Sequence, residues 1–126
     1  MIIGSGVDLC EVPRLKSATE RHGERFLQRI FTASEIAYCG SKANSFERYA
    51  ARFAAKEAGM KALGTGWRKG VTWHDFEVTR QPGGRPTLEL HGRAKEIANQ
   101  MGVAHISLSL THTAEQALAM VIFESA

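Results

Sequence analysis

Residues 45–66 read SFERYAARFAAKEAGMKALGTG and form the most clearly patterned stretch of the chain. Ser45 suits the N-cap position of a helix, the interior is rich in alanine, and Gly64 is a natural stop. Apolar residues recur in between at the spacing of one helical face. The pattern therefore predicts one long helix over 45–63, with that face packed into the core of the fold.

The opening residues, MIIGSGVDLC, predict a strand because side chains of two kinds alternate along them. One face, which we expect to be packed, carries Ile3, Val7 and Leu9, and the other carries Gly4, Gly6 and Asp8. Two glycines along one face leave room for a ligand or another backbone to approach closely. Asp8 is the residue that follows these glycines on the same face.

Turn and capping residues divide the rest of the chain into short elements. Before the long helix, Pro13 suits the first turn of a helix, Gly23 punctuates it, and Thr32 or Ser34 can cap a further short helix. After residue 66 we expect a helix at 92–101 and strands at 71–73, 76–79, 86–90, 106–111 and 117–123. This order predicts an α+β fold with a single domain over residues 1–126, in which an antiparallel sheet packs against one long helix and shorter helices.

The composition is that of an ordinary globular protein of 126 residues, with 44% hydrophobic and 23% charged content. No stretch approaches the roughly 18 continuous apolar residues that span a membrane. The opening residues lack the basic start and long apolar run of a signal peptide, so we expect a cytoplasmic protein. Cys10 and Cys39 are too few for a disulfide framework, which predicts reduced, buried thiols. The net charge of +3 favours an acidic partner or ligand.

A carboxylate interrupts the apolar face of the long helix. Helical spacing places Glu57 on the core-facing side, where a charge must be paired, protonated or bound to a metal. Lys61 lies four residues later and could pair with it. Asp8 supplies a second carboxylate from a separate element, and two such groups without surrounding histidine or cysteine suit magnesium. The alternative role for Asp8 is to cap the next helix.

Basic residues also follow one another along this helix. Arg48, Arg52 and Lys56 form a row at four-residue intervals, and Lys61 comes after them. Such a row is most often a solvated helix face. Beside the loop 64–66 it would also suit phosphate, with N–H groups of the loop supplementing a lysine. The dipole of the helix C-terminus disfavours anions, so the charges of lysine and metal would have to overcome it.

Hydroxyl side chains line one face of the strand expected at 106–111. Ser107, Ser109 and Thr111 alternate with apolar residues and lead to His112. Hydroxyls in a row suit a nucleotide or pantetheine site, although a solvent-facing strand is the commoner explanation. His112 would contact phosphate or simply finish a turn.

Arginines recur near one helix face in the N-terminal part of the chain. Arg14, Arg21 and Arg25 lie at intervals that suit a docking surface for an acidic partner, with Phe26 adjacent. Ordinary solvated arginines are the alternative, and Gly23 could break the register.

Five segments together resemble the bacterial holo-acyl-carrier-protein synthase family of phosphopantetheinyl transferases. They are GVDLCEVPRL at 6–15, RFLQRIFTASEI at 25–36, RFAAKEAGMKALGTG at 52–66, GGRPTLELHG at 83–92 and SLTHTAEQALAMVI at 109–122. They occur in the family order across nearly the whole chain, and the length is right for the family. The Asp8 segment is specific in combination with Lys56-Glu57-Ala58, Lys61 and the 64–66 loop.

The resemblance implies the 4'-phosphopantetheinyl transferase fold and a reaction in fatty acid biosynthesis. In that reaction the 4'-phosphopantetheine group of coenzyme A is transferred to a serine of apo acyl carrier protein, and adenosine 3',5'-bisphosphate leaves. Asp8 and Glu57 are the implied catalytic pair and Mg²⁺ ligands. The implied coenzyme A contacts are Arg52, Lys61, Gly64, Thr65, Gly66, Pro86, Ser109, Thr111 and His112, and the implied carrier-protein contacts are Arg14, Arg21, Arg25 and Phe26.

The resemblance also implies a homotrimer, because members of this family are typically trimeric and have each active site at a subunit boundary. Many of them carry a histidine where this chain has Ser107, so we do not expect the nucleotide contact of that histidine here. Glu57 is our candidate for taking the serine proton, directly or through a metal-bound water.

Three other functions remain open at this point. They are a non-catalytic module for coenzyme A or the carrier protein, metal-dependent hydrolysis of a nucleotide, and a nucleic-acid-binding domain. A sequence pI near 9.1 permits the last, but the arginines are not interleaved with an aromatic stacking platform.

Overall fold

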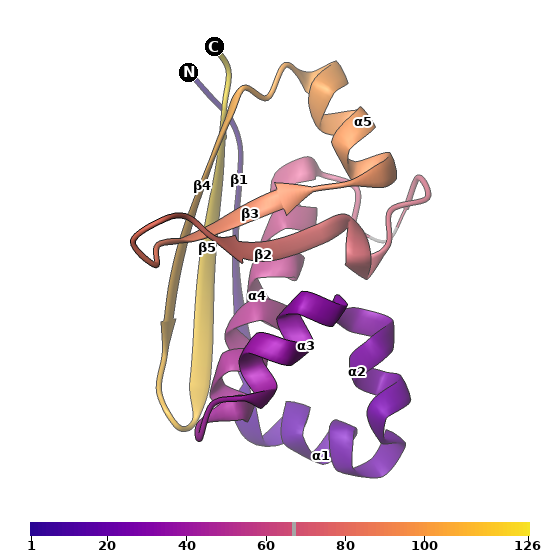
Figure 1. The fold of residues 1–126 in the computed structure, drawn as a ribbon. Helices are drawn as coiled ribbons and strands as arrows, with labels where there is room; N and C mark the ends of the chain where they lie inside the picture. Colours follow the sequence, from indigo (N-terminus) through magenta and orange to yellow (C-terminus); the bar gives the residue numbers. More distant parts are fainter. Residues whose placement is uncertain (67) are drawn as a thin grey trace.

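The computed structural model describes residues 1–66 and 68–126 of the chain (Figure 1). In chain order, its elements are β1 (Ile2–Glu11), α1 (Val12–His22), α2 (Glu24–Ile30), α3 (Ala33–Gly40), α4 (Ser45–Leu63), the 3-10 helix η1 (Trp73–Asp75), β2 (Phe76–Arg80), β3 (Pro86–Leu90), α5 (Gly92–Met101), β4 (His105–His112) and β5 (Gln116–Glu124). The expected sequence of one strand, several helices and then mostly strands is confirmed, and with it the α+β class.

The strands form two antiparallel sheets rather than the one that we expected. Three long strands make the larger sheet in the order β1-β5-β4, and β2 and β3 form a separate hairpin. Asp8 of β1 pairs with Ala119 of β5, and Ser109 of β4 pairs with Met120 of β5. Strand β5 therefore separates the strand that carries Asp8 from the strand that carries Ser109 (Figure 1).

Helix α4 packs against the glycine face of β1. A Cβ atom on Gly6 would collide with the carbonyl oxygen of Ala58, and Gly4 meets the same helix in the same way. Only glycine permits so close an approach, so the bare face of the strand receives another backbone. The expectation that the opposite face is the packed one is wrong, because Val7 and Leu9 are each 50% exposed.

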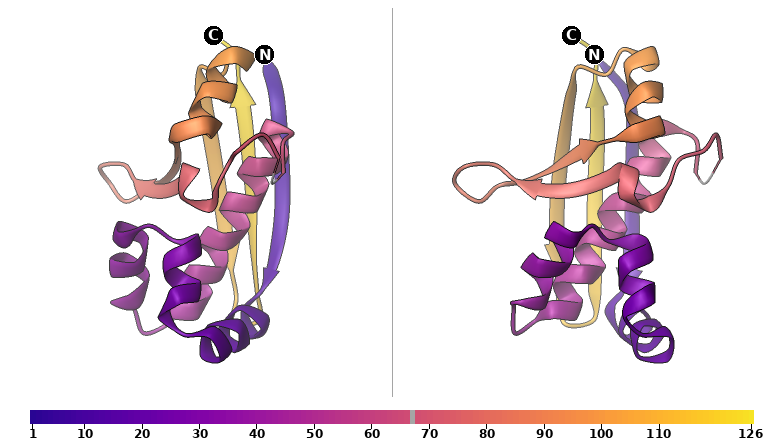
Figure 2. Two further views of the ribbon diagram at one scale, coloured as in Figure 1. Left: turned by 90° about the vertical axis from the view of Figure 1, so that its right-hand side faces the viewer. Right: turned by 45° about the vertical axis from the view of Figure 1, so that its right-hand side comes forward.

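The β2–β3 hairpin covers a second side of α4. A Cβ atom on Gly59 would lie 2.8 Å from the Phe76 ring and 3.1 Å from Leu88, so the hairpin packs closely on the helix. In both views of Figure 2, the hairpin and the helices drawn lie on the α4 side of the larger sheet. The outer face of the sheet is thus left without a covering layer among the described residues.

The helix ends follow the expected capping logic with one change. Gly64 ends α4 in the left-handed conformation (φ 81°), and Gly23 ends α1 with a positive φ of 74°. Thr32 caps α3 through a capping box with Glu35. The N-cap of α4 is Asn44 rather than Ser45, which is the first helical residue.

The strand expected at 71–73 is wrong. This stretch leads into η1, where the Thr72 hydroxyl donates to Asp75 Oδ1 at 3.1 Å and the two residues form a capping box. Short polar side chains that bond to nearby backbone in this way compete with strand pairing. The apolar alternation of so short a stretch therefore did not decide its conformation.

Both cysteines behave as expected. Cys10 and Cys39 are free and buried, and burial raises the pKa of each thiol to about 11. Among the described residues, no helix is long and apolar enough to cross a membrane.

Candidate active site

Asp8 on β1 and Glu57 on α4 are neighbours in the fold. Burial, a hydrogen bond with the Asp8 carboxyl and the Asp8 charge together raise the pKa of Glu57 to about 7. Two carboxyl groups this close cannot both ionise readily without a cation. The alternative role of Asp8 as a helix cap is excluded, because Asp8 lies within β1 and Glu11 is the N-cap of α1.

Lys61 pairs with Asp8 rather than with Glu57. Its Nζ lies 2.8 Å from Asp8 Oδ1 and donates to the carbonyl oxygen of Val7 at 3.0 Å. The hydrogen bond to Asp8 is the main reason that the pKa of Lys61 is raised. The expected ion pair between Lys61 and Glu57 does not form, because the long lysine side chain reaches from α4 across to Asp8 on β1.

The Asp8–Glu57 pair fits a magnesium ion by the chemistry of its donors. Both groups offer carboxylate oxygens, which are the ligands that hard divalent cations prefer. Burial first, and then the neighbouring Asp8 carboxyl, raise the pKa of Glu57, while the charge of Lys61 opposes this effect. A divalent cation would balance the negative charge of the two carboxylates, so the residues present suit the ion that the sequence predicts.

A second group of possible ligands, which the sequence analysis missed, lies on the hairpin. Atoms of Glu77, Glu89 and His91 lie within 4.8 Å of one another. The carboxylate of Glu77 already accepts from the hydroxyls of Thr32 and Ser34, each at 2.7 Å, and lies 3.0 Å from His91 Nε2. These contacts tie the start of α3 to β2, so we assign this group a structural role.

Lys56 does not belong to a solvated or phosphate-facing row. Its side chain is fully buried, and Nζ lies 2.8 Å from Glu35 Oε1 and donates to the Phe76 carbonyl oxygen. Burial lowers the pKa of Lys56, and the charge of Glu35 opposes this effect. The prediction of a basic row is wrong at this position because α3 and β2 cover that side of α4.

Arg52 is also buried, with 4% of its surface exposed. Its guanidinium lies 4.6 Å from the centre of the Tyr38 ring and donates to the Arg48 carbonyl oxygen at 3.4 Å. Five positions separate Arg52 from Glu57, which places them about 140° apart around the helix. Within one chain the structure therefore does not bring Arg52 to the carboxylate pair.

The 64–66 loop follows directly on the helix turn that carries Lys61. The N–H of Gly64 donates to the carbonyl oxygens of Met60 and Lys61, at 3.0 and 3.1 Å, so it closes the helix and is not available to a phosphate. Thr65 is buried, and its hydroxyl donates to the Gly66 carbonyl oxygen at 3.2 Å. We expected N–H groups of this loop to help bind phosphate, but the N–H of Gly64 already bonds within the helix.

The nucleotide-side candidates lie away from Asp8. Ser109 and Thr111 are exposed on the outer face of the larger sheet, whereas Asp8 lies on the face that meets α4. Ser109 and Pro86 line the same hollow of about 130 Å³, with Ser107 beside them. His112 points to the other face, where its Nδ1 lies 2.9 Å from Glu47 Oε1.

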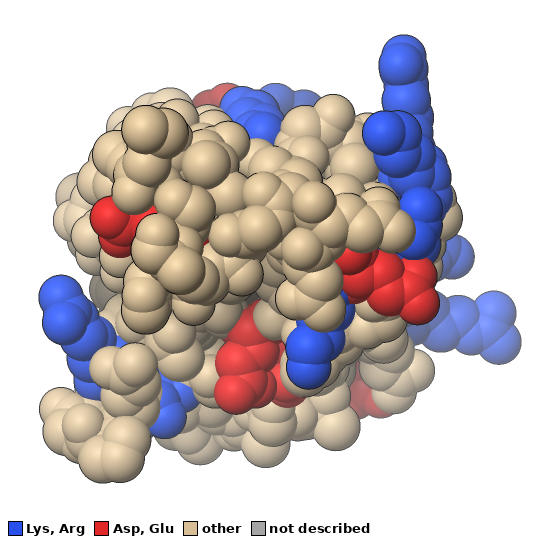
Figure 3. Space-filling model, turned by 90° about the horizontal axis from the view of Figure 1, so that it is seen from above, with Lys and Arg blue, Asp and Glu red and all other residues tan. Residues whose placement is uncertain are grey.

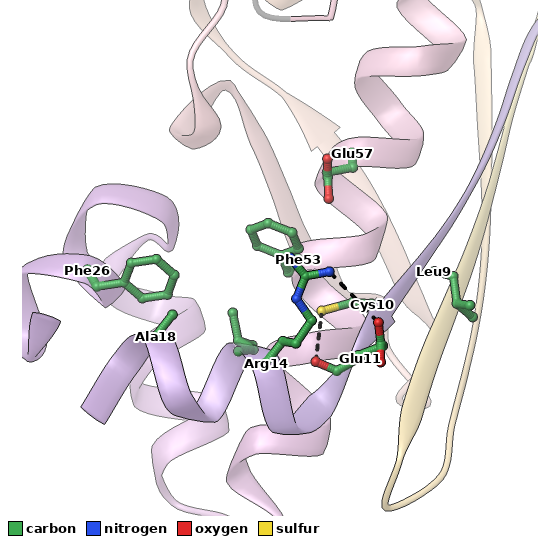
Figure 4. A pocket seen from close by; sticks show the side chains of 9 residues that line it. Leu9, Cys10, Glu11, Arg14, Ala18, Phe26, Phe53 and Glu57 are labelled. Carbon is green, nitrogen blue, oxygen red and sulfur yellow. Dashed lines mark hydrogen bonds and ion pairs between the residues drawn. The ribbon is translucent and has the colours of Figure 1, made fainter. Parts of the chain in front are cut away.

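A cavity of about 380 Å³ opens beside Glu57, between β1, α1, α2 and α4 (Figure 4). Its lining is mainly apolar, with Arg14 and Glu57 among the polar members; the residues are Leu9, Cys10, Glu11, Arg14, Leu15, Ala18, Phe26, Phe53 and Glu57. We missed Phe53 as a site residue because its helical spacing assigned it to the core. It precedes Glu57 by four residues, which places both on one face and was the available signal.

The three arginines expected to form a docking surface lie on two helices, because Gly23 ends the first of them. Arg14 and Arg21 lie on α1, and Arg25 and Phe26 lie on α2. Phe26 joins the two parts, because it lines the cavity beside Glu57 and also a hollow of about 360 Å³ with Arg25. The three arginines are exposed.

Charges of both signs are mixed over the end of the molecule that carries the two termini. In Figure 3, lysine and arginine side chains lie at separate places around this end, with carboxylates between them. This view shows no continuous basic track of the kind that follows a nucleic-acid backbone.

Comparison with known proteins identifies the family of the chain. The profile of the 4'-phosphopantetheinyl transferase superfamily matches residues 4–121. A holo-acyl-carrier-protein synthase of Koribacter versatilis is 59% identical over 124 residues, which cover 98% of this chain and 99% of that protein. The crystal structure of holo-acyl-carrier-protein synthase from Neisseria meningitidis superposes with a TM-score of 0.90 at 30% identity, covering 99% of this chain and 100% of that one.

A further similar structure is the Helicobacter pylori holo-acyl-carrier-protein synthase in complex with coenzyme A. It has a TM-score of 0.81 at 31% identity, and the match covers 95% of this chain and 99% of that one. The family profile spans most of the chain, and these relatives match from end to end. The chain therefore belongs to the 4'-phosphopantetheinyl transferase superfamily.

Proposed function

We propose that this chain transfers the 4'-phosphopantetheine group of coenzyme A to a serine of apo acyl carrier protein, as a step of fatty acid biosynthesis. The observation that carries the proposal is the Asp8–Glu57 pair, in which Asp8 pairs with Lys61 and Glu57 lines the cavity between β1, α1, α2 and α4. Similar proteins are holo-acyl-carrier-protein synthases, and one of them is in complex with coenzyme A. Coenzyme A is accordingly the co-substrate.

The reaction replaces one oxygen on phosphorus by another, and the protein's residues assist by proton transfer, charge stabilisation and positioning. The serine oxygen forms a bond to the phosphorus nearer the pantetheine arm, and the bond from that phosphorus to the departing adenosine 3',5'-bisphosphate breaks. Glu57, whose carboxyl lines the cavity beside α1, accepts the serine proton. Lys61 stabilises phosphate charge, and the remaining rate enhancement comes from positioning.

Asp8 and Glu57 would hold Mg²⁺, which when bound neutralises charge on the pyrophosphate. The phosphates lie, in this proposal, near the end of α4, where Thr65 and Gly66 follow Lys61. Because the Gly64 N–H closes the helix, the side chain of Lys61 is the stronger phosphate donor at this end.

We also propose a homotrimer in which a second copy completes each site. Asp8 faces α4, whereas Ser109 and Thr111 face outward, so one chain cannot present all three to one coenzyme molecule. An outward apolar patch would bring copies together; its members are Val7, Leu9, Leu118 and Met120, which are 37–50% exposed. In this arrangement Pro86, Ser109 and Thr111 serve the nucleotide of a coenzyme bound at a neighbour's Asp8. Arg52 is buried against Tyr38 and His112 pairs with Glu47, so each would have to leave that contact to reach a phosphate or the nucleotide.

The carrier protein docks, in this proposal, on α1 and α2. Arg14, Arg21 and Arg25 offer positive charge to an acidic helix, and Phe26 offers an apolar contact. Arg14 and Phe26 border the same cavity as Glu57, as Figure 4 shows. A carrier bound there would have its serine close to the proton acceptor. We expect no nucleic-acid or membrane partner, and a cytoplasmic location.

The reaction can be tested by intact-mass spectrometry of apo acyl carrier protein incubated with this protein, coenzyme A and magnesium. The expected result is one phosphopantetheine of added mass, absent when a chelator replaces magnesium. Glu57→Gln should lower the rate strongly while the fold survives. Glu96→Gln, at an exposed carboxylate on α5, is the matched control and should react like the wild type.

Two of the alternative functions predict no mass gain of the carrier protein, and a further measurement separates them. Coenzyme A binding without mass gain indicates a non-catalytic module, and phosphate release without a carrier indicates a hydrolase. Full activity of the Glu57→Gln protein would overturn the assignment of the proton acceptor.

A further inference from the structure

Lys61 occupies the place beside Asp8 that a cation would take. Its ammonium lies 2.8 Å from Asp8 Oδ1 and donates to the Val7 carbonyl oxygen at 3.0 Å. Asp8 is the more enclosed partner, with 14% of its side chain exposed, while 57% of the Lys61 side chain is exposed. The pair is therefore anchored on the carboxylate side and free to move on the lysine side.

The proposed function asks Lys61 and Asp8 to do different things at the same time. Asp8 has to offer its carboxylate to a divalent cation, and Lys61 has to offer its ammonium to a phosphate. In the structure each satisfies the other, so neither is fully available for its role. A lysine ammonium has three N–H donors, and Asp8 and Val7 take two of them.

We propose that Lys61 is a placeholder cation: it neutralises Asp8 in the free protein and moves to a phosphate of coenzyme A, which releases Asp8 for the divalent cation. This inference rests on the proposed function and adds to it a coupling between the binding of coenzyme A and the binding of the metal. Coenzyme A and the metal should favour each other's binding, because each removes a competitor of the other. The free protein should hold the metal more weakly than its two carboxylates alone would allow.

Because Lys61 is exposed, breaking its ion pair with Asp8 costs little free energy. An exposed ion pair shifts an equilibrium by up to about fivefold, and coupling between two ligands through a shared group typically amounts to about 5–150-fold. Asp8 is more enclosed than a surface carboxylate, so we expect an effect towards the upper end of the first range or just above it. Removing Lys61 should thus tighten metal binding to the free protein about three- to tenfold.

The direct test measures Mn²⁺ binding to the protein without coenzyme, by electron paramagnetic resonance of the unbound ion. Lys61→Met should lower the Mn²⁺ dissociation constant about three- to tenfold. Lys61→Arg retains the charge and should stay near the wild type. Lys95→Met, at an exposed lysine on α5, removes the same net charge elsewhere and should change little.

The converse test measures coenzyme A binding in EDTA. Asp8→Asn frees Lys61, so it should tighten coenzyme binding about threefold, and this gain should vanish when Lys61→Met is also present. Glu57→Gln removes a neighbouring carboxylate that Lys61 does not contact at hydrogen-bond distance, and it should give a smaller gain. Double-mutant coupling between positions 8 and 61 would support the exchange.

The outcomes separate the inference from the function beneath it. If Mn²⁺ binding depends on Asp8 but is the same in the wild type and Lys61→Met, the placeholder role is wrong and the metal site stands. If Asp8→Asn leaves Mn²⁺ binding unchanged, the metal site itself is wrong, and the inference falls with it.

Discussion

Replacing Lys56 by methionine tests how the fold holds helix α4, which carries Glu57. Lys56 and Glu35 are both completely buried, with 2.8 Å between Nζ and Oε1. The carboxylate of Glu35 also accepts the N–H of Thr32 and the N–H of Val78, each at 2.8 Å. This network joins α4 to the start of α3 and to β2.

Lys56→Met would leave the Glu35 charge buried without its cation. Losing one partner of a buried ion pair typically costs about 3–5 kcal/mol, which is a large part of the roughly 5–15 kcal/mol that stabilises a domain. The two remaining N–H donors to Glu35 would soften the loss, so about 3 kcal/mol is expected. Glu35→Leu should cost at least as much, because it also leaves those two N–H groups unsatisfied.

Urea unfolding followed by far-ultraviolet circular dichroism measures these free energies. The double variant Glu35→Leu/Lys56→Met should be more stable than the sum of the single losses by about 2–3 kcal/mol, because no buried charge is left unpaired. Lys95→Met, on an exposed part of α5, is the control and should change stability by less than about 0.5 kcal/mol. A loss below about 1 kcal/mol for Lys56→Met would refute the reasoning.

Further predictions concern pH, packing, capping and assembly. Without a metal ion, folding raises the pKa of Glu57 from 4.5 to about 7, so the folded state keeps a proton that the unfolded state loses. In EDTA the free energy of unfolding should therefore fall as the pH rises from 5 to 8. The expected fall is about 1–2 kcal/mol, because Glu57 is partly exposed and solvent screens its charge. Urea titrations across that range should show no such fall for Glu57→Gln, and equal slopes would contradict the assignment. Gly6→Ala should cost at least about 2 kcal/mol by thermal melting, because its Cβ would meet the Ala58 carbonyl. Thr32→Ala should cost about 1 kcal/mol in urea through the lost capping box. Met120→Lys should convert the proposed trimer to monomers by size-exclusion chromatography with light scattering, and a persistent trimer would argue against packing through the outer sheet face.

Local sequence signals predicted the individual elements well. Helix α4 spans the expected residues 45–63 because alanine-rich helical periodicity and a left-handed glycine at Gly64 both act within a few residues. Strand β3 and helix α5 also begin and end where proline, glycine and periodicity place them. The helix pattern predicted only that Glu57 needs a partner, and it favoured Lys61. The pairing of Asp8 with Glu57 at one site was implied by the family resemblance.

The misassigned residues are those whose surroundings come from distant parts of the chain. Periodicity places Lys56 and Glu57 on neighbouring strips of one helix, but it does not say which strip is covered. The structure buries Lys56 under α3 and β2 and leaves Glu57 at a cavity. For the same reason Val7 was assigned to the core, although the glycine face of β1 is the one that meets α4.

Local sequence signals thus predict the α+β class and the helix that carries Glu57. Tertiary packing is needed to see that Lys61 pairs with Asp8, that Lys56 is internal, and that Ser109 lies on the opposite face of the sheet from Asp8. The physical reason is that capping and periodicity are short-range, whereas burial and ion pairing depend on which elements pack together. A strand has two faces and a helix has several, and only packing selects the one that meets the core.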